Sequence, residues 1–330
     1  MIIAPNWLGD AVMALPAIAD VRSGTRDGSL AIAARPSIAP LFSLVRGLDD
    51  VIVLPPRGPW PLQEYEAAIL LPNSFHAAMS AARAGVRERW GYRTDWRGML
   101  LTRAIDRAPA RVHQIDIYQR LTAALGFAGG PSTPRLDVPQ HVRESGAALL
   151  RSAGWNGRSA VVAIAPGAAY GSAKRWPPSS FADLAAGLAE DGVVTVMVGA
   201  AADKATAVEV TRELRGRATL IDVVGQTDIP ALAGVLATCR ALVANDSGAL
   251  HLAAALGVSV SGAFGPTDDR LSAPRAASPE LRVPSPESRV TILTNETWCR
   301  PCALRECPLD HMCMIGIPAA DALAATRKAL

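Results

Sequence analysis

The sequence carries almost no net charge. Its 33 lysines and arginines nearly balance 30 aspartates and glutamates, which leaves a formal charge of +3. This charge is too small for a general nucleic-acid binder, and because the basic residues are mostly arginines they suit discrete anionic groups such as phosphates. Half of the residues are apolar, which excludes disordered and fibrous chains.

Long hydrophobic runs are also lacking. Residues 247–267 have no full charges, but glycines, a proline, serines and a histidine interrupt them, so a buried helix followed by a strand fits better than a membrane span. The beginning, MIIAPNWLGD, has neither a basic leader nor a long apolar core, and we expect no signal peptide. We therefore expect a cytoplasmic protein.

Several common catalytic motifs are missing. The sequence has no G-x-G-x-x-G after a predicted strand, no G-x-x-x-x-G-K-[ST], no G-x-S-x-G and no H-E-x-x-H. This removes the motif-based arguments for a dinucleotide dehydrogenase, a P-loop enzyme, an α/β-hydrolase and a zincin.

The chain instead alternates between short apolar runs and helix-like segments. The runs typical of strands are residues 1–4, 30–34, 51–54, 67–71, 161–165, 193–198, 220–224, 241–244 and 258–264. Because helix-like segments separate them, they predict βαβ units and parallel sheets covered by helices on both faces. The predicted fold class is therefore α/β.

The length predicts two domains. A chain of 330 residues exceeds what one hydrophobic core usually organises, and segment 126–142 has the Gly and Pro content of a linker. We place the domains at residues 1–145 and 146–330, each a doubly wound sheet, with the last helix a candidate to pack back on the first domain. We expect ligands at the carboxyl ends of the strands, in a cleft between the domains.

Residues 166–177, PGAAYGSAKRWP, form the most informative motif. They follow a predicted strand, precede a predicted helix and combine two glycines with the adjacent cations Lys174 and Arg175. A turn that exposes backbone N–H groups near cations suits a diphosphate. A solvated loop with an exposed basic pair is an equally good interpretation of the composition alone.

Residues 245–251, NDSGALH, form a second junction between a strand and a helix. Asp246 or Ser247 can cap the helix, which leaves its free N–H groups available to an anion. Ser247 and His251 lie four residues apart and share a helical face. The alternative is a simple cap at Asp246 and a half-buried His251, but two phosphate-suited turns in one half of the chain favour a binding site.

Asp10 follows Gly9 at the first predicted junction between a strand and a helix. An N-cap is the simpler interpretation from spacing alone. The helix N-terminus would also keep this carboxylate ionised, so that it could accept a proton from an attacking hydroxyl.

Five motifs run in order along nearly the whole chain: PNWLGD at 5–10, LPNSF at 71–75, PGAAYGSAKRWP at 166–177, NDSGALHLAAAL at 245–256 and FGPTDD at 264–269. Together they closely resemble the ADP-heptose:lipopolysaccharide heptosyltransferases, glycosyltransferase family 9, and most of all heptosyltransferase II. The resemblance implies a GT-B fold, in which a first Rossmann-like domain binds the acceptor and a second binds the nucleotide sugar.

The resemblance also implies an activity. This is inverting transfer of L-glycero-D-manno-heptose from ADP-heptose to a heptose of the lipid A inner core, with no cofactor required for catalysis. By motif position, Asp10 is the base, and Asn73 and Ser74 contact the acceptor. The residues implied for the ADP-sugar are Gly167, Lys174, Asp203, Asp246, Ser247, Gly248 and His251. Because the motifs do not name the sugar, a glycosyltransferase using another nucleotide sugar and a non-catalytic nucleotide-sugar-binding module stay open.

An anionic lipid acceptor further implies peripheral contact with the cytoplasmic face of the inner membrane. Arginines that could meet acceptor phosphates or lipid headgroups gather in the first half: Arg83, Arg87, Arg89, Arg93, Arg97 and Arg103. A solvated arginine-rich face is an equally good interpretation.

Four of the five cysteines are crowded into one segment. Cys299, Cys302, Cys307 and Cys313 have C-x2-C-x4-C-x5-C spacing, and thiolates so spaced are good ligands of zinc or an iron–sulfur cluster. A structural metal is one interpretation, and reduced thiols or a local disulfide are the others. Cys239 is more simply a buried apolar residue.

Overall fold

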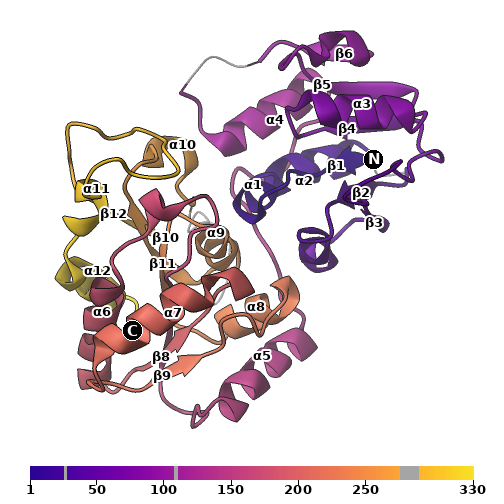
Figure 1. The fold of residues 1–330 in the computed structure, drawn as a ribbon. Helices are drawn as coiled ribbons and strands as arrows, with labels where there is room; N and C mark the ends of the chain where they lie inside the picture. Colours follow the sequence, from indigo (N-terminus) through magenta and orange to yellow (C-terminus); the bar gives the residue numbers. More distant parts are fainter. Residues whose placement is uncertain (26–27, 108–110, 276–289) are drawn as a thin grey trace. The chain divides into compact units, whose positions relative to one another are not determined.

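The computed structural model describes residues 1–25, 28–107, 111–275 and 290–330 (Figure 1). The chain divides into two compact units, Met1–Leu136 and Asp137–Leu330. Each unit contains a parallel sheet of six strands, with helical segments between most successive strands. In these ranges, no helix has the length and apolar character needed to cross a membrane.

The sheet of the first unit has the strand order β3-β2-β1-β4-β5-β6. Its strands are β1 (Ile2–Ile3), β2 (Ala31–Ala34), β3 (Asp50–Val53), β4 (Ala67–Leu70), β5 (Glu88–Tyr92) and β6 (Arg103–Ile105). The helical segments are α1 (Leu8–Met13), α2 (Leu15–Gly24), η1 (Ala39–Leu44), α3 (Phe75–Arg83), η2 (Arg97–Leu100) and α4 (Gln114–Ala124). Strand β1 pairs with both β2 and β4, so the topological switch point lies between β1 and β4.

The second unit repeats this topology with the order β12-β11-β10-β7-β8-β9. Its strands are β7 (Val161–Ala165), β8 (Val194–Met197), β9 (Leu220–Asp222), β10 (Ala241–Asn245), β11 (Ser259–Phe264) and β12 (Val290–Thr294). Its helical segments are α5 (Gln140–Ser152), η3 (Ser172–Lys174), α6 (Pro178–Glu190), η4 (Ala201–Asp203), α7 (Lys204–Leu214), α8 (Ile229–Leu236), α9 (Gly248–Ala255), α10 (Asp269–Ser272), α11 (Met312–Ile315) and α12 (Ala319–Arg327). The switch point of this sheet lies between β7 and β10.

The two doubly wound parallel sheets confirm the predicted α/β class. All of the predicted strands are present in the structure, but β5, β6 and β12 were missed. These three strands lie at or next to a sheet edge, and none of them is fully buried. Because only strands buried on both faces need continuous apolar runs, these three strands carried a weak sequence signal, although the edge strands β3 and β9 were predicted.

The boundary between the two units lies nine residues before the predicted one, at Leu136 rather than residue 145. Helix α5 spans the predicted boundary and packs as a whole on α8 of the second unit. A Cβ atom added to Gly146 would lie 2.1 Å from the carbonyl carbon of Gly234, so the two helices approach closely because both residues are glycines. The last helix, α12, contacts α6 and the strands β10, β11 and β12 of the second unit.

The core of the second unit extends beneath the loop that follows β7. Trp176, near the end of this loop, is fully buried and packs edge-on against Phe181, with ring centroids 4.9 Å apart. Its indole N–H donates a hydrogen bond of 3.0 Å to the carbonyl of Ile317. The end of motif 166–177 is therefore anchored in the core, and its first residues, 166–168, are buried as well, which leaves residues 169–172 as the more exposed turn.

Candidate active site

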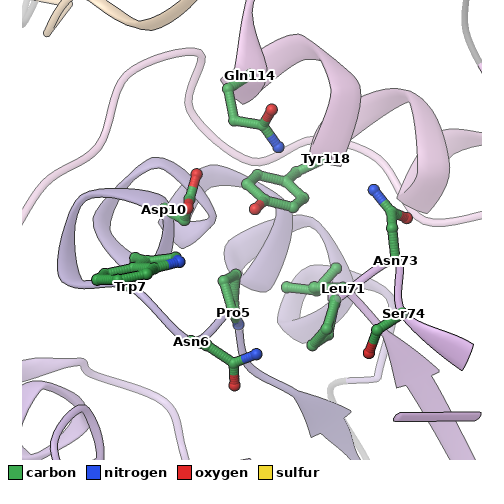
Figure 2. Close-up of a pocket in the computed structure, with 10 residues that line it drawn as sticks. Pro5, Asn6, Trp7, Asp10, Leu71, Asn73, Ser74, Gln114 and Tyr118 are labelled. Carbon is green, nitrogen blue, oxygen red and sulfur yellow. The ribbon is translucent and has the colours of Figure 1, made fainter. Parts of the chain in front are cut away.

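A pocket of about 270 Å³ lies at the switch point of the first sheet. The segments after β1 and β4 and the start of α4 form it, and Figure 2 shows the residues that line it. Three predicted site residues, Asp10, Asn73 and Ser74, line this one cavity. The structure thus brings together the motifs PNWLGD and LPNSF, which lie more than sixty residues apart in the sequence.

Asp10 is the third residue of α1 rather than its cap. Trp7 holds the N-cap position by its backbone angles and makes no side-chain capping bond. The simpler interpretation of Asp10, a helix cap, is therefore wrong. Asp10 lines the pocket in the first turn of the helix, beside Gln114 and Tyr118 of α4 (Figure 2).

Tyr118 and Gln114 are pocket residues that the sequence analysis missed. Burial and the negative charge of Asp10 raise the pKa of Tyr118 well above its ordinary value, while a hydrogen bond from Gln114 acts in the opposite direction. The phenol is therefore neutral and able to donate a hydrogen bond next to the carboxylate. The two residues lie four apart on α4, so the helical face that they share was the available signal.

Asn73 and Ser74 lie between β4 and α3. The hydroxyl of Ser74 accepts a hydrogen bond of 3.2 Å from the backbone N–H of Ala77 and so caps α3. The amide oxygen of Asn73 accepts a hydrogen bond of 3.4 Å from Arg97, and its backbone carbonyl accepts one of 3.0 Å from the Thr94 hydroxyl. Ser74 is thus both the N-cap of α3 and a pocket residue. Asn73 also lines the pocket, and its hydrogen-bond partners Arg97 and Thr94 lie outside the pocket lining.

Arg97 is fully buried and does not face solvent. Its guanidinium donates to the carbonyls of Tyr92 and Pro72 and to Asn73, and burial lowers its pKa to about 10. Arg97 therefore holds the pocket loop in place, and the expectation that it meets acceptor phosphates or headgroups is wrong.

Two further arginines of the predicted basic group turn to backbone carbonyls. Arg89 donates to Leu100, and Arg103 donates to Leu125 and Ala124. Arg83, Arg87 and Arg93 are exposed. Arg103 is exposed as well, so of the six predicted arginines only Arg89 and Arg97 are withdrawn from an exposed face.

A buried ion pair occupies the switch point of the second sheet. The ammonium of Lys174, from motif 166–177, lies 2.5 Å from a carboxylate oxygen of Asp246, which follows β10. The hydroxyl of Thr267 donates to the same oxygen at 2.7 Å, and the ammonium lies 4.8 Å from the centre of the Tyr170 ring. Three of the five motifs therefore meet around one carboxylate.

Helix α9 starts at Gly248, and Ser247 is its N-cap residue by backbone geometry. The Ser247 side chain makes no capping bond, and its hydroxyl oxygen is buried without a hydrogen-bond partner in the described part of the chain. Asp246 is bound to Lys174 and Thr267 and does not cap the helix, contrary to one of the predicted options. His251 lies one turn on and is buried. The start of α9 thus presents N–H groups and one unsatisfied hydroxyl.

Gly167 and Asp203 lie against each other, although they come from different loops. A Cβ atom on Gly167 would lie 2.2 Å from the carboxyl carbon of Asp203. The Asp203 carboxylate also accepts a hydrogen bond of 2.9 Å from the backbone N–H of Ala200. The two predicted donor residues are therefore brought together after β7 and β8.

Asn245 is a buried positioning residue that the sequence analysis left without a role. Its amide nitrogen donates to the carbonyls of Pro166, at 2.8 Å, and Gly167, at 3.2 Å. Its amide oxygen accepts from the backbone N–H of Trp176 at 2.9 Å. One side chain at the end of β10 thus joins both ends of motif 166–177.

The five cysteines are free thiols in the structure. Burial, followed by the charges of Cys299, Cys307 and Cys302, raises the pKa of Cys313. Among the residues that the structure describes, no group of three or more His, Cys, Asp or Glu side chains is arranged to hold a metal ion. The other three thiols are therefore near enough to influence Cys313, but the four do not fit a metal site in this arrangement. Cys239 is buried, as expected.

Comparison with known proteins gives a consistent family assignment. The model of "Glycosyltransferase family 9 (heptosyltransferase)" matches residues 62–313. The lipopolysaccharide heptosyltransferase 2 of Salmonella typhimurium is 27% identical over 300 residues, which cover 83% of this chain and 84% of that protein. Each of the two matches covers most of the chain. The family match includes the switch point between β7 and β10.

Solved structures show the same fold. The Escherichia coli ADP-heptose lipopolysaccharide heptosyltransferase II superposes with a TM-score of 0.79 at 22% identity, covering 99% of this chain and 97% of that one. A family 9 glycosyltransferase from Veillonella parvula gives a TM-score of 0.82 at 18% identity, covering 99% and 96%. The predicted GT-B fold is thereby confirmed. With a family model that matches most of its length, the chain belongs to glycosyltransferase family 9, the heptosyltransferase family, and is a glycosyltransferase.

Proposed function

We propose that this glycosyltransferase moves L-glycero-D-manno-heptose from ADP-heptose to a heptose of the lipopolysaccharide inner core, with inversion. One observation carries the proposal. The motifs predicted for the acceptor lie together at the switch point of the first sheet, and the motifs predicted for the donor lie together at the switch point of the second sheet. Asp10 lies in a pocket with the acceptor motif, and the donor motifs meet around Lys174 and Asp246. The names of relatives such as lipopolysaccharide heptosyltransferase 2 support the choice of substrates.

On the acceptor side, Asp10 acts as the general base. The acceptor hydroxyl gives its proton to the Asp10 carboxylate while its oxygen forms a bond to the anomeric carbon of the donor. Tyr118 remains a neutral phenol, and its O–H group orients the carboxylate or the acceptor by a hydrogen bond. Asn73 and Ser74 contact the acceptor sugar. General-base catalysis of this kind contributes about 10²–10⁴ in rate.

On the donor side, the bond between the anomeric carbon and the phosphate oxygen breaks, and its electron pair stays with ADP. Attack from the face opposite the leaving group inverts the anomeric carbon. The N–H groups at Gly248, the unsatisfied Ser247 hydroxyl and Lys174 stabilise the charge that develops on the diphosphate. Gly167, Asp203 and His251 complete the proposed donor site, with Asp203 toward the ribose.

These protein groups supply the electrostatic stabilisation, so the proposed mechanism needs no metal cofactor. A metal held by Cys299, Cys302, Cys307 and Cys313 would be structural, and the arrangement of the thiols does not favour one. Analysis of protein purified without chelator tests this, because a full equivalent of zinc or iron would show that the thiols rearrange to bind it.

The activity is tested with the purified full chain, ADP-heptose and lipopolysaccharide truncated after its first heptose. Mass spectrometry should detect an acceptor heavier by one heptose, and the Asp10→Asn variant should form this product far more slowly. ADP-mannose, UDP-glucose and GDP-mannose serve as competing donors. Turnover with one of these and not with ADP-heptose would establish the related glycosyltransferase instead. Donor binding without turnover on any acceptor would favour the binding module.

The acceptor is a lipid, and we propose that the protein contacts the cytoplasmic face of the inner membrane through the turn at residues 95–99. Trp96 and Met99 expose 88% and 82% of their surface there. The turn is joined to the acceptor loop, since the Asp95 carboxylate accepts a hydrogen bond of 2.6 Å from the N–H of Phe75. An exposed tryptophan and methionine suit the interfacial region of a bilayer.

Sedimentation with vesicles of phosphatidylethanolamine and phosphatidylglycerol tests this contact. The variant with Trp96→Ser and Met99→Ser should sediment less than the unchanged protein. Trp298→Ser is the matched control, because Trp298 is equally exposed, at 82%, on the second unit. Equal sedimentation of the three proteins would exclude this turn as the contact.

A further inference from the structure

Residues 300–305 of the cysteine-rich segment, called the strap below, lie against two loops of the proposed donor site. The Tyr170 hydroxyl donates a hydrogen bond of 2.9 Å to the carbonyl of Ala303, and the N–H of Ala173 donates one of 3.0 Å to the carbonyl of Arg305. The N–H of Ala303 in turn donates one of 2.7 Å to the carbonyl of Pro266. The strap thus touches both the loop after β7 and the loop after β11.

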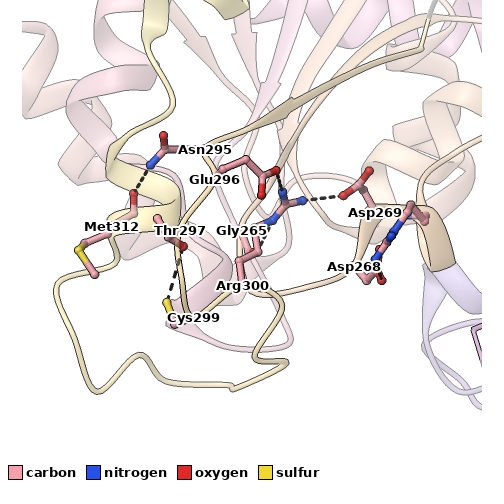
Figure 3. A network of polar contacts seen from close by, with 10 residues as sticks. Gly265, Asp268, Asp269, Asn295, Glu296, Thr297, Cys299, Arg300 and Met312 are labelled. Atoms are coloured by element: carbon pink, nitrogen blue, oxygen red, sulfur yellow. Dashed lines mark hydrogen bonds and ion pairs between the residues drawn. The ribbon is translucent and has the colours of Figure 1, made fainter.

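Arg300 anchors the strap at its beginning (Figure 3). Its side chain is only 8% exposed, and its guanidinium pairs with Asp269 at 2.6 Å and with Glu296 at 2.8 Å. It also donates a hydrogen bond of 3.0 Å to the carbonyl of Gly265. A charged group with all of its partners in place fixes the path of the backbone that follows.

Gly171 allows the strap to approach the donor loop at its other end. A Cβ atom there would lie 2.1 Å from the carbonyl oxygen of Arg305, so any other residue would push the strap away. The position of the Arg305 backbone is therefore set by the donor loop itself.

This arrangement places two cations on one aromatic ring. The guanidinium carbon of Arg305 lies 5.2 Å from the centre of the Tyr170 ring, and the Lys174 ammonium lies 4.8 Å from the same centre. Both distances are within the range of a cation–π interaction. Arg305 is thus directed to the part of the donor loop that carries Lys174.

The two cations differ in how much charge they can offer. The charge of Lys174 is compensated by Asp246, whose carboxylate lies 2.5 Å away and is even more buried than the lysine. Arg305 is exposed and forms no ion pair with any residue in the described ranges. A nucleoside diphosphate carries at least two negative charges, and Lys174, whose charge is shared with Asp246, offsets only part of them. An uncompensated cation beside the pair is what the leaving group requires.

We propose that Arg305 is a donor-binding residue that supplies this uncompensated charge to the diphosphate. The inference rests on the proposed function and adds a residue to its donor site. The guanidinium donates two parallel hydrogen bonds to phosphate oxygens. As the anomeric C–O bond breaks, the charge on the phosphate grows and Arg305 stabilises the leaving ADP. The cysteine-rich segment thereby serves as the scaffold that carries Arg305 to the donor.

The test is calorimetric titration of the full chain with ADP and with AMP. Arg305→Gln should weaken ADP binding about ten- to hundredfold, as expected for loss of hydrogen bonds to a charged group. The affinity for AMP should fall much less, so the ratio of ADP affinity to AMP affinity should decrease. Arg305→Lys should recover part of that preference, because it keeps the charge and loses the bidentate geometry. Arg158→Gln, an exposed arginine just before β7, is the control with the same change in net charge.

Three results would overturn the inference. The first is an unchanged ADP affinity in Arg305→Gln. The second is an equal loss for ADP and AMP, which would mean that the residue only shapes the loop. The third is an equal effect of the Arg158→Gln control. If the unchanged protein binds no ADP at all, the proposed function itself fails. Thermal unfolding of each variant separates a loss of binding from a loss of fold.

Discussion

Lys174 and Asp246 form an ion pair of 2.5 Å between side chains that expose 12% and 7% of their surface. The pair joins the loop after β7 to the turn after β10, so it contributes to the fold as well as to the donor site. Breaking a buried pair by removing one partner leaves an uncompensated charge and costs about 3–5 kcal/mol. Removing both partners costs much less.

The first prediction separates these two contributions. Lys174→Met and Asp246→Leu should each lower the thermal unfolding temperature clearly, because one buried charge remains. The double variant should recover most of this stability, yet heptose transfer should stay lost because the donor has no cation at this position. Transfer at the unchanged rate in the double variant would contradict a catalytic role for Lys174.

Asp10→Asn should reduce transfer by about 10²–10⁴, the usual contribution of a general base. The substitution keeps the size of the side chain in the first turn of α1 and removes its basicity. ADP binding, measured by calorimetry, should not change, because the donor residues belong to the second unit. The matched control is Asp106→Asn, an exposed aspartate of the first unit, which should transfer normally. Normal turnover of Asp10→Asn would refute the assignment.

Arg97→Lys should raise the KM for the acceptor while leaving the KM for ADP-heptose unchanged. A lysine keeps the charge but cannot reach Tyr92, Pro72 and Asn73 at once, so Asn73 loses its support. Arg97→Met should in addition destabilise the protein, at about 1–3 kcal/mol for each buried oxygen left unpaired. Steady-state kinetics and chemical denaturation measure the two effects. Equal increases in both KM values would show that Arg97 acts on the whole fold and not on the pocket loop.

Gly167→Ala should weaken ADP binding, because its Cβ atom would displace the Asp203 carboxylate. Overpacking of this kind typically costs about 1–3 kcal/mol of stability. The variant with Gly167→Ala and Asp203→Ala removes the clash and should recover stability without recovering ADP affinity. Full recovery of affinity, measured by calorimetry, would show that Asp203 does not contact the nucleotide.

Transfer should proceed at the unchanged rate in the presence of a chelator such as EDTA. The proposed stabilisation of the leaving ADP comes from Lys174, Arg305 and the start of α9, none of which depends on a metal ion. The assay is the mass-spectrometric transfer reaction, with and without added magnesium. Loss of transfer that magnesium or zinc restores would contradict the metal-independent mechanism.

Much of the fold could be predicted because its strands are buried on both faces. β2, β7 and β10 are buried along their whole length and therefore consist of continuous apolar residues, except for Asn245 at the end of β10. Edge strands such as β6 lack this constraint. The start of the second unit depends on the packing of α5 against α8. This packing is a tertiary contact, and no local sequence pattern indicates it.

The sequence predicted the position of a candidate-site residue where a motif follows a predicted strand. Asp10, Lys174 and Ser247 each lie in the segment that follows a strand that the sequence predicts, so topology alone brings these segments to the switch points. The sequence alone does not indicate which residues each of these side chains contacts. Nothing local indicates that Arg97 turns inward, or that Arg305 comes to lie on Tyr170 from more than a hundred residues away.

The contact between Gly146 and Gly234 determines where the chain can be cut without loss of either unit. The backbones of α5 and α8 touch with no side chain between them, so a protease should not gain access to α5. Limited digestion should therefore cut the chain before Gln140 and not within the helix. The larger fragment would then keep α5 attached to α8. Exchanging first units among relatives, in order to alter the acceptor, should likewise place the junction ahead of this helix and carry both glycines together.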